Sequence, residues 1–406
     1  MQGTKASYRW VILAVLSLAI FSPNYLQYQL SPLGGRLMET LGITTAQFSA
    51  IFSAPMVPAI FLSLVSGILT DSFGPRRVIG VAMFVSALGA CFDIFSMGFT
   101  GMYVCMLMIG FAAAFINANG VKVLSSWFPP EKIGMMLGVF LSCSTLAMAL
   151  ATGTTALFST TRSALVVGAV VAIAAFAAWI LFMRDKNGAG DTPARERANL
   201  KESLSAVLHS RAVWLSGSVL FCVMGCIMGF GTFLPTALAS RGIDVVTAGT
   251  VTSVFMLGSL VGALLAPVLA ARLQREKPLL LGLCALCGLG TAFAWRLPEG
   301  GLLICGLFLS GICTGGLMPL IMSVPVRQPE IGSRYAGTAG GVIATLQLLG
   351  AVIVPTYVAA PVAGTNYTLF YVITGAFMLI ALAAVIMLPK EKKYTKEAQL
   401  YADAQC

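Results

Sequence analysis

The stretch Gly67-Ile68-Leu69-Thr70-Asp71-Ser72-Phe73-Gly74-Pro75-Arg76-Arg77 decides the fold of this chain. It lies between two long apolar runs, and its Gly74-Pro75 dipeptide favours a tight turn. The two arginines that follow are typical of a loop on the cytoplasmic side of a membrane, because positive charge in short loops fixes the orientation of the neighbouring spans. The stretch therefore predicts two membrane-spanning helices joined by a cytoplasmic turn, with Asp71 at the end of the first.

The composition of the whole chain is that of a membrane protein. Of its 406 residues, 58% are apolar and 10% are charged, and the mean hydropathy is +0.90. Soluble domains are about 25% charged, so a soluble core of this size would lack the polar surface to cover it. The net charge of +10 would suggest a nucleic-acid partner in a soluble protein. Here the positive charges lie in loops and act as topology signals, so no nucleic acid is expected.

Twelve apolar windows are long enough to cross a hydrocarbon core of about 30 Å. They fall near 9–33, 44–70, 78–98, 102–126, 134–157, 162–183, 212–236, 246–271, 278–296, 301–324, 335–359 and 367–388. The fold class that they predict is an all-α membrane protein with two pseudo-symmetric six-helix bundles. We expect four parts, which are an N-terminal bundle at 1–183, a cytoplasmic linker at 184–211, a C-terminal bundle at 212–389 and a cytoplasmic tail at 390–406.

The basic residues predict the orientation of the chain. With the N-terminus inside, the opposite side receives only Arg36, Arg162, Arg241 and Arg296. The positive-inside rule then places both termini in the cytoplasm and the chain in the cell (inner) membrane. A weak internal repeat supports two related halves. Each half has a basic loop after its second span and a Pro-Glu turn after its fourth, although the second basic loop lacks the aspartate and the turn glycine.

The pattern Gly-x-Leu-x-Asp-x-x-Gly-x-Arg-Arg of the opening stretch resembles the loop signature between helices 2 and 3 of the major facilitator superfamily of transporters. That resemblance implies two halves that rock about a central substrate site, and a loop that holds the halves together on the cytoplasmic side. It implies a cytoplasmic gate made of Asp71, Arg76, Arg77, Glu131 and Glu330. Asp71 would lie at the positive end of the eleventh helix, and an arginine would pair with Glu131. The alternative is that these charges only fix the topology.

The resemblance also places the substrate near the midplane, so polar residues inside the spans are the candidate ligands. The expected substrate-binding residues are Tyr25, Tyr28, Asn117, Asn119, Lys122 and Thr145. A lysine inside a span costs ~2.5–3.5 kcal/mol unless it faces water, a partner or an anion. We therefore expect a secondary transporter of a small organic anion, for example a monocarboxylate, with Lys122 as its counter-charge.

Two alternatives stay open for these residues. Lys122 lies five residues before Trp127 and can snorkel to the membrane surface, while the tyrosines can form an interfacial aromatic belt. The chain would then carry a small neutral or zwitterionic solute, such as an amino acid. A receptor that keeps the fold without transport is a further alternative. The sequence does not determine the substrate or the direction of transport. It also does not determine whether transport is coupled to a proton, coupled to an exchanged anion or uncoupled.

Other classes of function are disfavoured. The sequence shows no metal-ligand cluster, no nucleophile–base pair and no nucleotide-binding loop, so we expect neither an enzyme nor a cofactor. The ten cysteines are interpreted as small buried thiols. Asp93 is the only carboxylate well inside a span, and we expect it to bond to a neighbour instead of relaying protons. The partners that we expect are a small-molecule substrate and the lipid bilayer, with the chain as a monomer.

The predicted topology can be tested with two tags, one inserted at position 190 and one at the C-terminus. Both are expected to react with antibody only after cells are permeabilised, because both lie on the side that the basic residues mark as cytoplasmic. Reaction of either tag in intact cells would show that a span had been miscounted.

Overall fold

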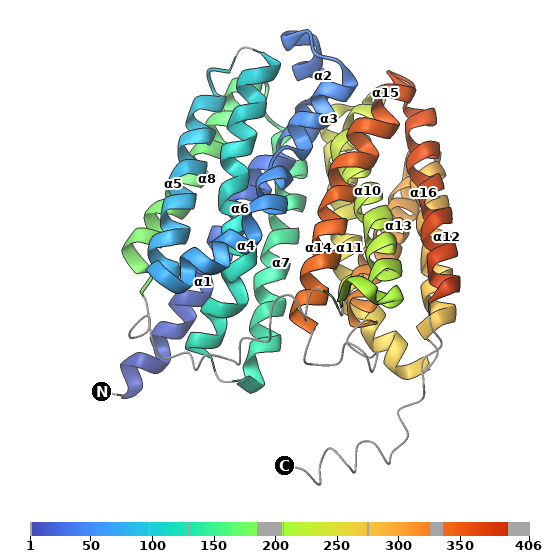
Figure 1. Ribbon diagram of the computed structural model, residues 1–406. Helices are drawn as coiled ribbons and strands as arrows, with labels where there is room; N and C mark the ends of the chain where they lie inside the picture. Colours follow the sequence, from blue (N-terminus) through green and yellow to red (C-terminus); the bar gives the residue numbers. More distant parts are fainter. Residues whose placement is uncertain are drawn as a thin grey trace, which may run out of the picture.

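The computed structural model describes residues 2–96, 98–128, 130–184, 205, 207–273, 276–324 and 336–388. This described part is helical, without a strand. Figure 1 shows the helices as two groups that stand side by side, with the N-terminal half in blue to green and the C-terminal half in yellow-green to red. Most of the predicted linker at 184–211 and all of the predicted tail at 390–406 lie outside the described residues.

The described residues of the N-terminal half form eight helices. They are α1 (Gln2–Tyr28), α2 (Leu30–Leu41), α3 (Thr45–Ser53), α4 (Met56–Phe73), α5 (Pro75–Asp93), α6 (Phe99–Trp127), α7 (Pro130–Thr155) and α8 (Thr161–Phe182). The described part of the C-terminal half contains six long helices and a few shorter elements. They are α10 (Arg211–Ala239), α11 (Val245–Leu273), α12 (Glu276–Phe293), the 3-10 helix η1 (Ala294–Arg296), α13 (Gly301–Ser323), α14 (Ala336–Val352), the π-helical η3 (Ile353–Ala359), α15 (Ala360–Ala363) and α16 (Tyr367–Met387).

The predicted number of spans is confirmed. Within the described residues, 11 helices are long and apolar enough to cross a membrane. The twelfth span is a broken one, in which Thr45–Ser53 and Met56–Leu62 are bent by 46°. The prediction of the first span was too short, because the chain continues beyond a break at Gln29 as α2 and reaches Leu41.

The turn between α4 and α5 has the conformation that its sequence predicts. Gly74 has a φ of +82°, which side chains rarely adopt, and Pro75 is the first residue of α5. The Gly74 amide donates to the Thr70 carbonyl at 3.1 Å. The Arg76 backbone is fixed to α8, because Trp179 Nε1 donates to the Arg76 carbonyl at 3.0 Å. The turn therefore joins three spans of the N-terminal half.

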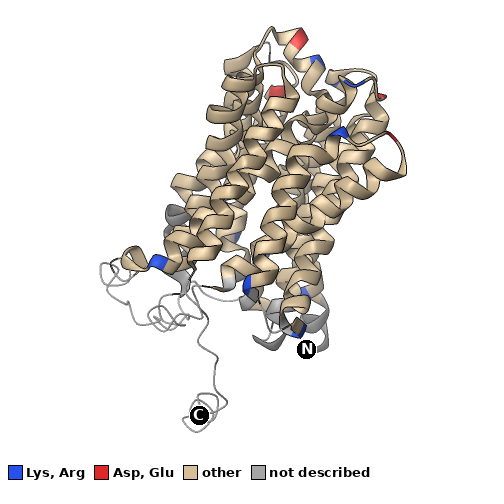
Figure 2. Ribbon diagram, turned by 90° about the vertical axis from the view of Figure 1, so that its right-hand side faces the viewer, with Lys and Arg blue, Asp and Glu red and all other residues tan. Residues whose placement is uncertain are grey.

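The bundle has two ends that differ in how the halves meet. We call the end where α1 begins and α16 ends the near end, and the opposite end, which carries α2, α3 and α15, the far end (Figure 1). In Figure 2 the described charged residues gather toward these two ends and leave a broad middle band that is almost free of charge. Such a band is what a bilayer requires, because an unpaired charge in hydrocarbon is costly.

Three hydrophobic clusters form the core. The far-end cluster contains residues of both halves, for example Tyr28 and Phe233. The two near-end clusters each belong to one half, with Leu16 in the N-terminal one and Leu317 in the C-terminal one. The halves thus share a core at the far end and keep separate cores at the near end.

Helices α11 and α13 pack through glycines on both sides. Gly258 and Gly262 of α11 face Gly311 and Gly315 of α13, and a Cβ on any of the four would collide with the backbone of the other helix. In each helix the two glycines are four residues apart, which is the small-residue spacing that lets membrane helices approach closely. Backbone-to-backbone packing therefore holds these two spans together.

Gly262→Leu should destabilise the protein, while Gly282→Leu should not. The Gly262 side chain position is filled by the Ile312 carbonyl, whereas nothing lies within 4 Å of a Cβ at Gly282, which is also helical. Overpacking of this kind costs about 1–3 kcal/mol or more. Thermal unfolding of the purified protein in detergent measures the difference, and equal melting temperatures for the two variants would contradict this packing.

Candidate functional site

Hydroxyl groups join the two halves at the far end between α3 and η3. The Thr356 hydroxyl lies 2.9 Å from that of Ser49 and 3.1 Å from that of Ser53. All three side chains are buried. Ser53 also donates to the Ser49 carbonyl at 2.9 Å, so its hydroxyl is held in place by its own helix. A short network of neutral hydrogen bonds therefore connects the second span to the eleventh.

A second contact between the halves connects α7 to α11. The hydroxyls of Thr152 and Ser253 lie 2.9 Å apart, and Ser253 donates to the Ala149 carbonyl at 2.7 Å. Two glycines allow this approach, because a Cβ at Gly153 would meet the Ser253 hydroxyl and one at Gly249 would meet α7. The fifth and eighth spans are thus in direct contact.

The third contact connects the first span to the seventh. The hydroxyl of Tyr28 donates to Met228 Sδ at 3.9 Å, and its ring fills the space above Gly231. The Tyr28 ring also packs edge-on against Phe52, with the centroids 5.2 Å apart. We call these three contacts together the far-end seal. The described residues of the two halves share a core and these three contacts at the far end, so this conformation is closed there.

The two predicted tyrosines both lie in this far half of the bundle. Tyr28 is fully buried in the seal. Tyr25 is 6% exposed, its hydroxyl lies 3.2 Å from that of Thr154, and its ring stacks on Phe21 at 5.8 Å. In this conformation their hydroxyl groups therefore bond to protein atoms.

Helix α6 separates the predicted residues that it carries. Asn119 is buried and donates to the Ser66 hydroxyl at 2.6 Å and to the Phe115 carbonyl at 2.9 Å. Asn117 is exposed, since residues two positions apart on a helix face in different directions. Lys122 is half-buried, as is Thr145 on α7. The structure does not bring all six predicted residues together.

The predicted gate is only partly visible. Glu330 and the side chains of Asp71 and Glu131 lie outside the described residues. Arg76 is exposed and donates through Nη2 to the Ile180 carbonyl at 3.1 Å, and Arg77 is exposed at the end of the α4–α5 turn. Helices α4 and α14 contact each other.

Sequence reasoning missed the far-end seal. Ser49, Ser53, Thr356 and Ser253 were not among the candidates, because a hydroxyl in a span usually bonds to its own helix backbone. The π-helical segment η3 was missed as well, although Pro355 inside it is a signal of irregular backbone. π-helical turns occur frequently at functional sites.

Other polar groups in the spans have simple roles. Asp93 is buried and accepts a hydrogen bond from Ser96 at 3.2 Å, so the expectation that it bonds to a neighbour is confirmed.

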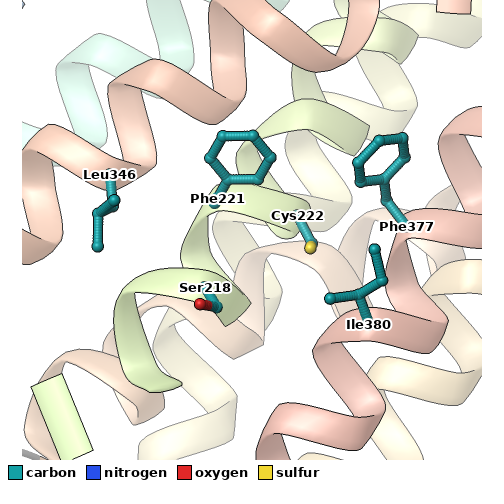
Figure 3. Close-up of a pocket in the computed structure, with 6 residues that line it drawn as sticks. All are labelled: Ser218, Phe221, Cys222, Leu346, Phe377 and Ile380. Atoms are coloured by element: carbon teal, nitrogen blue, oxygen red, sulfur yellow. The ribbon is translucent and has the colours of Figure 1, made fainter. Parts of the chain in front are cut away.

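Figure 3 shows a small groove between α10, α14 and α16. Its volume is about 150 Å³. It is lined by apolar side chains with the Ser218 hydroxyl and the Cys222 thiol, and it contains none of the predicted residues.

Comparison with known proteins identifies the family. Residues 10–355 match the family model of the Major Facilitator Superfamily. The chain belongs to this superfamily. It is therefore a membrane transporter and not an enzyme, as predicted.

Relatives of this transporter resemble it over nearly the whole chain. The probable sulfoacetate transporter SauU of Cupriavidus necator is 23% identical, over 94% of each chain. The probable nitrate transporter NarT of Staphylococcus epidermidis is 24% identical, over 90% of this chain and 92% of its own. The crystal structure of the nucleoside transporter NupG has a TM-score of 0.72 at 16% identity, and the match covers 93% of this chain and all of that one. This last likeness confirms the fold.

Proposed function

We propose that this transporter carries a small organic anion, such as a monocarboxylate, by alternating access between its two halves. The observation that carries the proposal is Lys122, a half-buried cation on helix α6, just beyond the apolar span Phe99–Gly120. The names of SauU and NarT, which refer to sulfoacetate and nitrate, support it, because both are small anions. A cation inside a span is stabilised by an anion that enters from water.

In this proposal Thr145, half-buried on α7, is a further ligand. Asn117 is exposed, but it lies five residues before Lys122, about 140° around α6, so the two side chains do not share a face of the helix. Tyr28 would bind substrate only when the halves separate at the far end, because its hydroxyl contacts Met228 of the other half. Tyr25 lies beside it on the same helix. Asn119 acts indirectly, by holding α6 against Ser66 of α4.

The second candidate is a transporter of a neutral or zwitterionic solute. It is favoured by the position of Lys122, five residues before the end of α6 at Trp127. A lysine at that depth can extend along the helix and place its ammonium group at the membrane surface. Lys122 would then take no part in substrate binding, and polar uncharged groups would provide the site.

We further propose that the near end is cytoplasmic and carries the gate of the other conformation. Its residues are Asp71, Arg76, Arg77, Glu131 and Glu330, as the loop signature implies. Exposed ion pairs contribute roughly 0–1 kcal/mol each, which suits contacts that form and break in every transport cycle. Closing the near end would require the far-end seal to open.

Asp71→Asn and Arg77→Ala should shift the protein toward the conformation that is closed at the far end. Thr356→Cys provides the reporter, because position 356 is buried in the seal and reacts with an impermeant maleimide only when the far end opens. The exposed Cys305 is replaced by serine, so that the maleimide does not react with it. Labelling should fall by up to about five-fold, which corresponds to the loss of one exposed ion pair. Arg211→Ala, at the near end outside the gate, is the control, and unchanged labelling in both gate variants would refute the gate.

Lys122→Gln separates the two candidate functions. If Lys122 faces an anionic substrate, losing one partner of a desolvated charge pair typically costs 2–5 kcal/mol, so the apparent affinity should weaken by about 30-fold or more. Lys122→Arg keeps the charge with a different geometry and should retain part of the activity. Uptake of a panel of carboxylates and neutral amino acids into proteoliposomes measures this. Equal affinities of the wild type and Lys122→Gln for every transported compound would favour the neutral-solute function.

A further inference from the structure

An apolar groove runs along the N-terminal half between α4, α5 and α6. It has a volume of about 400 Å³, and its lining includes Phe73 of α4, Val81 of α5 and Phe111 of α6. Among the described residues that line it, Arg77 at the start of α5 is the one charged side chain and the others are apolar. The described part of the groove therefore combines a hydrocarbon surface with a positive charge.

The groove opens toward the bilayer. Val81 is 65% exposed and Phe73 is 60% exposed, although both are large apolar side chains. Helices α5 and α6 pack mainly against other helices of the N-terminal half, such as each other and α8 or α4. The groove thus lies on the outer surface of that half.

The length of the groove matches one leaflet of a membrane. From Arg77 to Val85, both of which line it, α5 advances eight residues, or ~12 Å along its axis. Half of a hydrocarbon core of ~30 Å is ~15 Å. The charged end of the groove therefore lies near the depth of lipid headgroups at the near end, and its apolar part extends toward the midplane.

The charged end is suited to an anion. Arg77 is exposed, and within the described part of the chain its guanidinium makes no hydrogen bond or ion pair. It lies at the N-terminus of α5, a helix of 19 residues, where Gly74 has no side chain to cap the first amides. A helix N-terminus attracts negative charge, and arginine binds phosphate with two parallel hydrogen bonds.

We propose that this groove is a binding site for an anionic phospholipid of the near-end leaflet. One acyl chain lies along Phe73, Val81 and Phe111, and the phosphate group contacts Arg77 and the first amides of α5. The lipid thereby covers apolar side chains and neutralises a cation at the membrane surface. A zwitterionic phospholipid fits the same groove but gains less from Arg77, because its headgroup carries its own positive charge.

The test measures, by native mass spectrometry, how tightly two short-chain lipids bind to the purified full-length protein. Dioctanoyl-phosphatidylglycerol should bind about five-fold more tightly than dioctanoyl-phosphatidylcholine, which corresponds to one arginine near the headgroup. Arg77→Gln should remove this preference. Val81→Trp, which fills the groove from an exposed position, should weaken the binding of both lipids. Arg211→Gln, an exposed arginine at the near end outside the groove, should behave like the wild type.

Binding is measured without transport because Arg77 also belongs to the proposed gate. A preference that persists in Arg77→Gln, or unchanged binding in Val81→Trp, would show that lipids cover the surface without a defined site and would overturn the proposal. Inorganic phosphate at the same concentration should leave the phosphatidylglycerol bound. Its displacement by phosphate would overturn the assignment to a lipid.

Discussion

The structure depends on one constraint, which is that hydrocarbon offers no hydrogen-bond partners to a polypeptide backbone. Each span must therefore be a helix, and a break in a helix is tolerated only where protein covers it. The breaks in this chain obey that rule. Gln29, between α1 and α2, is 1% exposed, and Ala54, between α3 and α4, is fully buried. Most of the π-helical segment η3, including Pro355 and Thr356, is buried as well.

The α3–α4 break and η3 also lie where the two halves meet. The α3–α4 break packs against Gly110 of α6, whose Cβ position is filled by the Pro55 backbone. Directly before it, Ser49 and Ser53 face Thr356 of η3. Broken helices can change direction without disturbing the rest of a span, so the irregular segments are the parts of the bundle best able to move. The part of the far-end seal that joins Ser49 and Ser53 to Thr356 is built on them.

The seal uses weak neutral contacts, whereas the gate proposed at the near end uses charges. A neutral hydrogen bond contributes about 0.5–1.5 kcal/mol, and the seal has few of them. The remaining contact area is apolar, with Tyr28 against Phe52 and Gly231. Contacts of this strength hold one conformation without making it permanent, as a transporter that alternates between two states requires.

The amino-acid sequence by itself determined the number of spans, the turn at Gly74-Pro75 and the family. Each of these depends on local properties, namely runs of apolar residues, a glycine with positive φ and a short charged motif. Only the tertiary structure decided which polar side chains are accessible. Asn117 and Asn119 look equivalent in the sequence, yet one is exposed and the other bonds to Ser66. The reason is that the direction a side chain faces depends on which helices pack around its span, and that packing joins residues far apart in the chain.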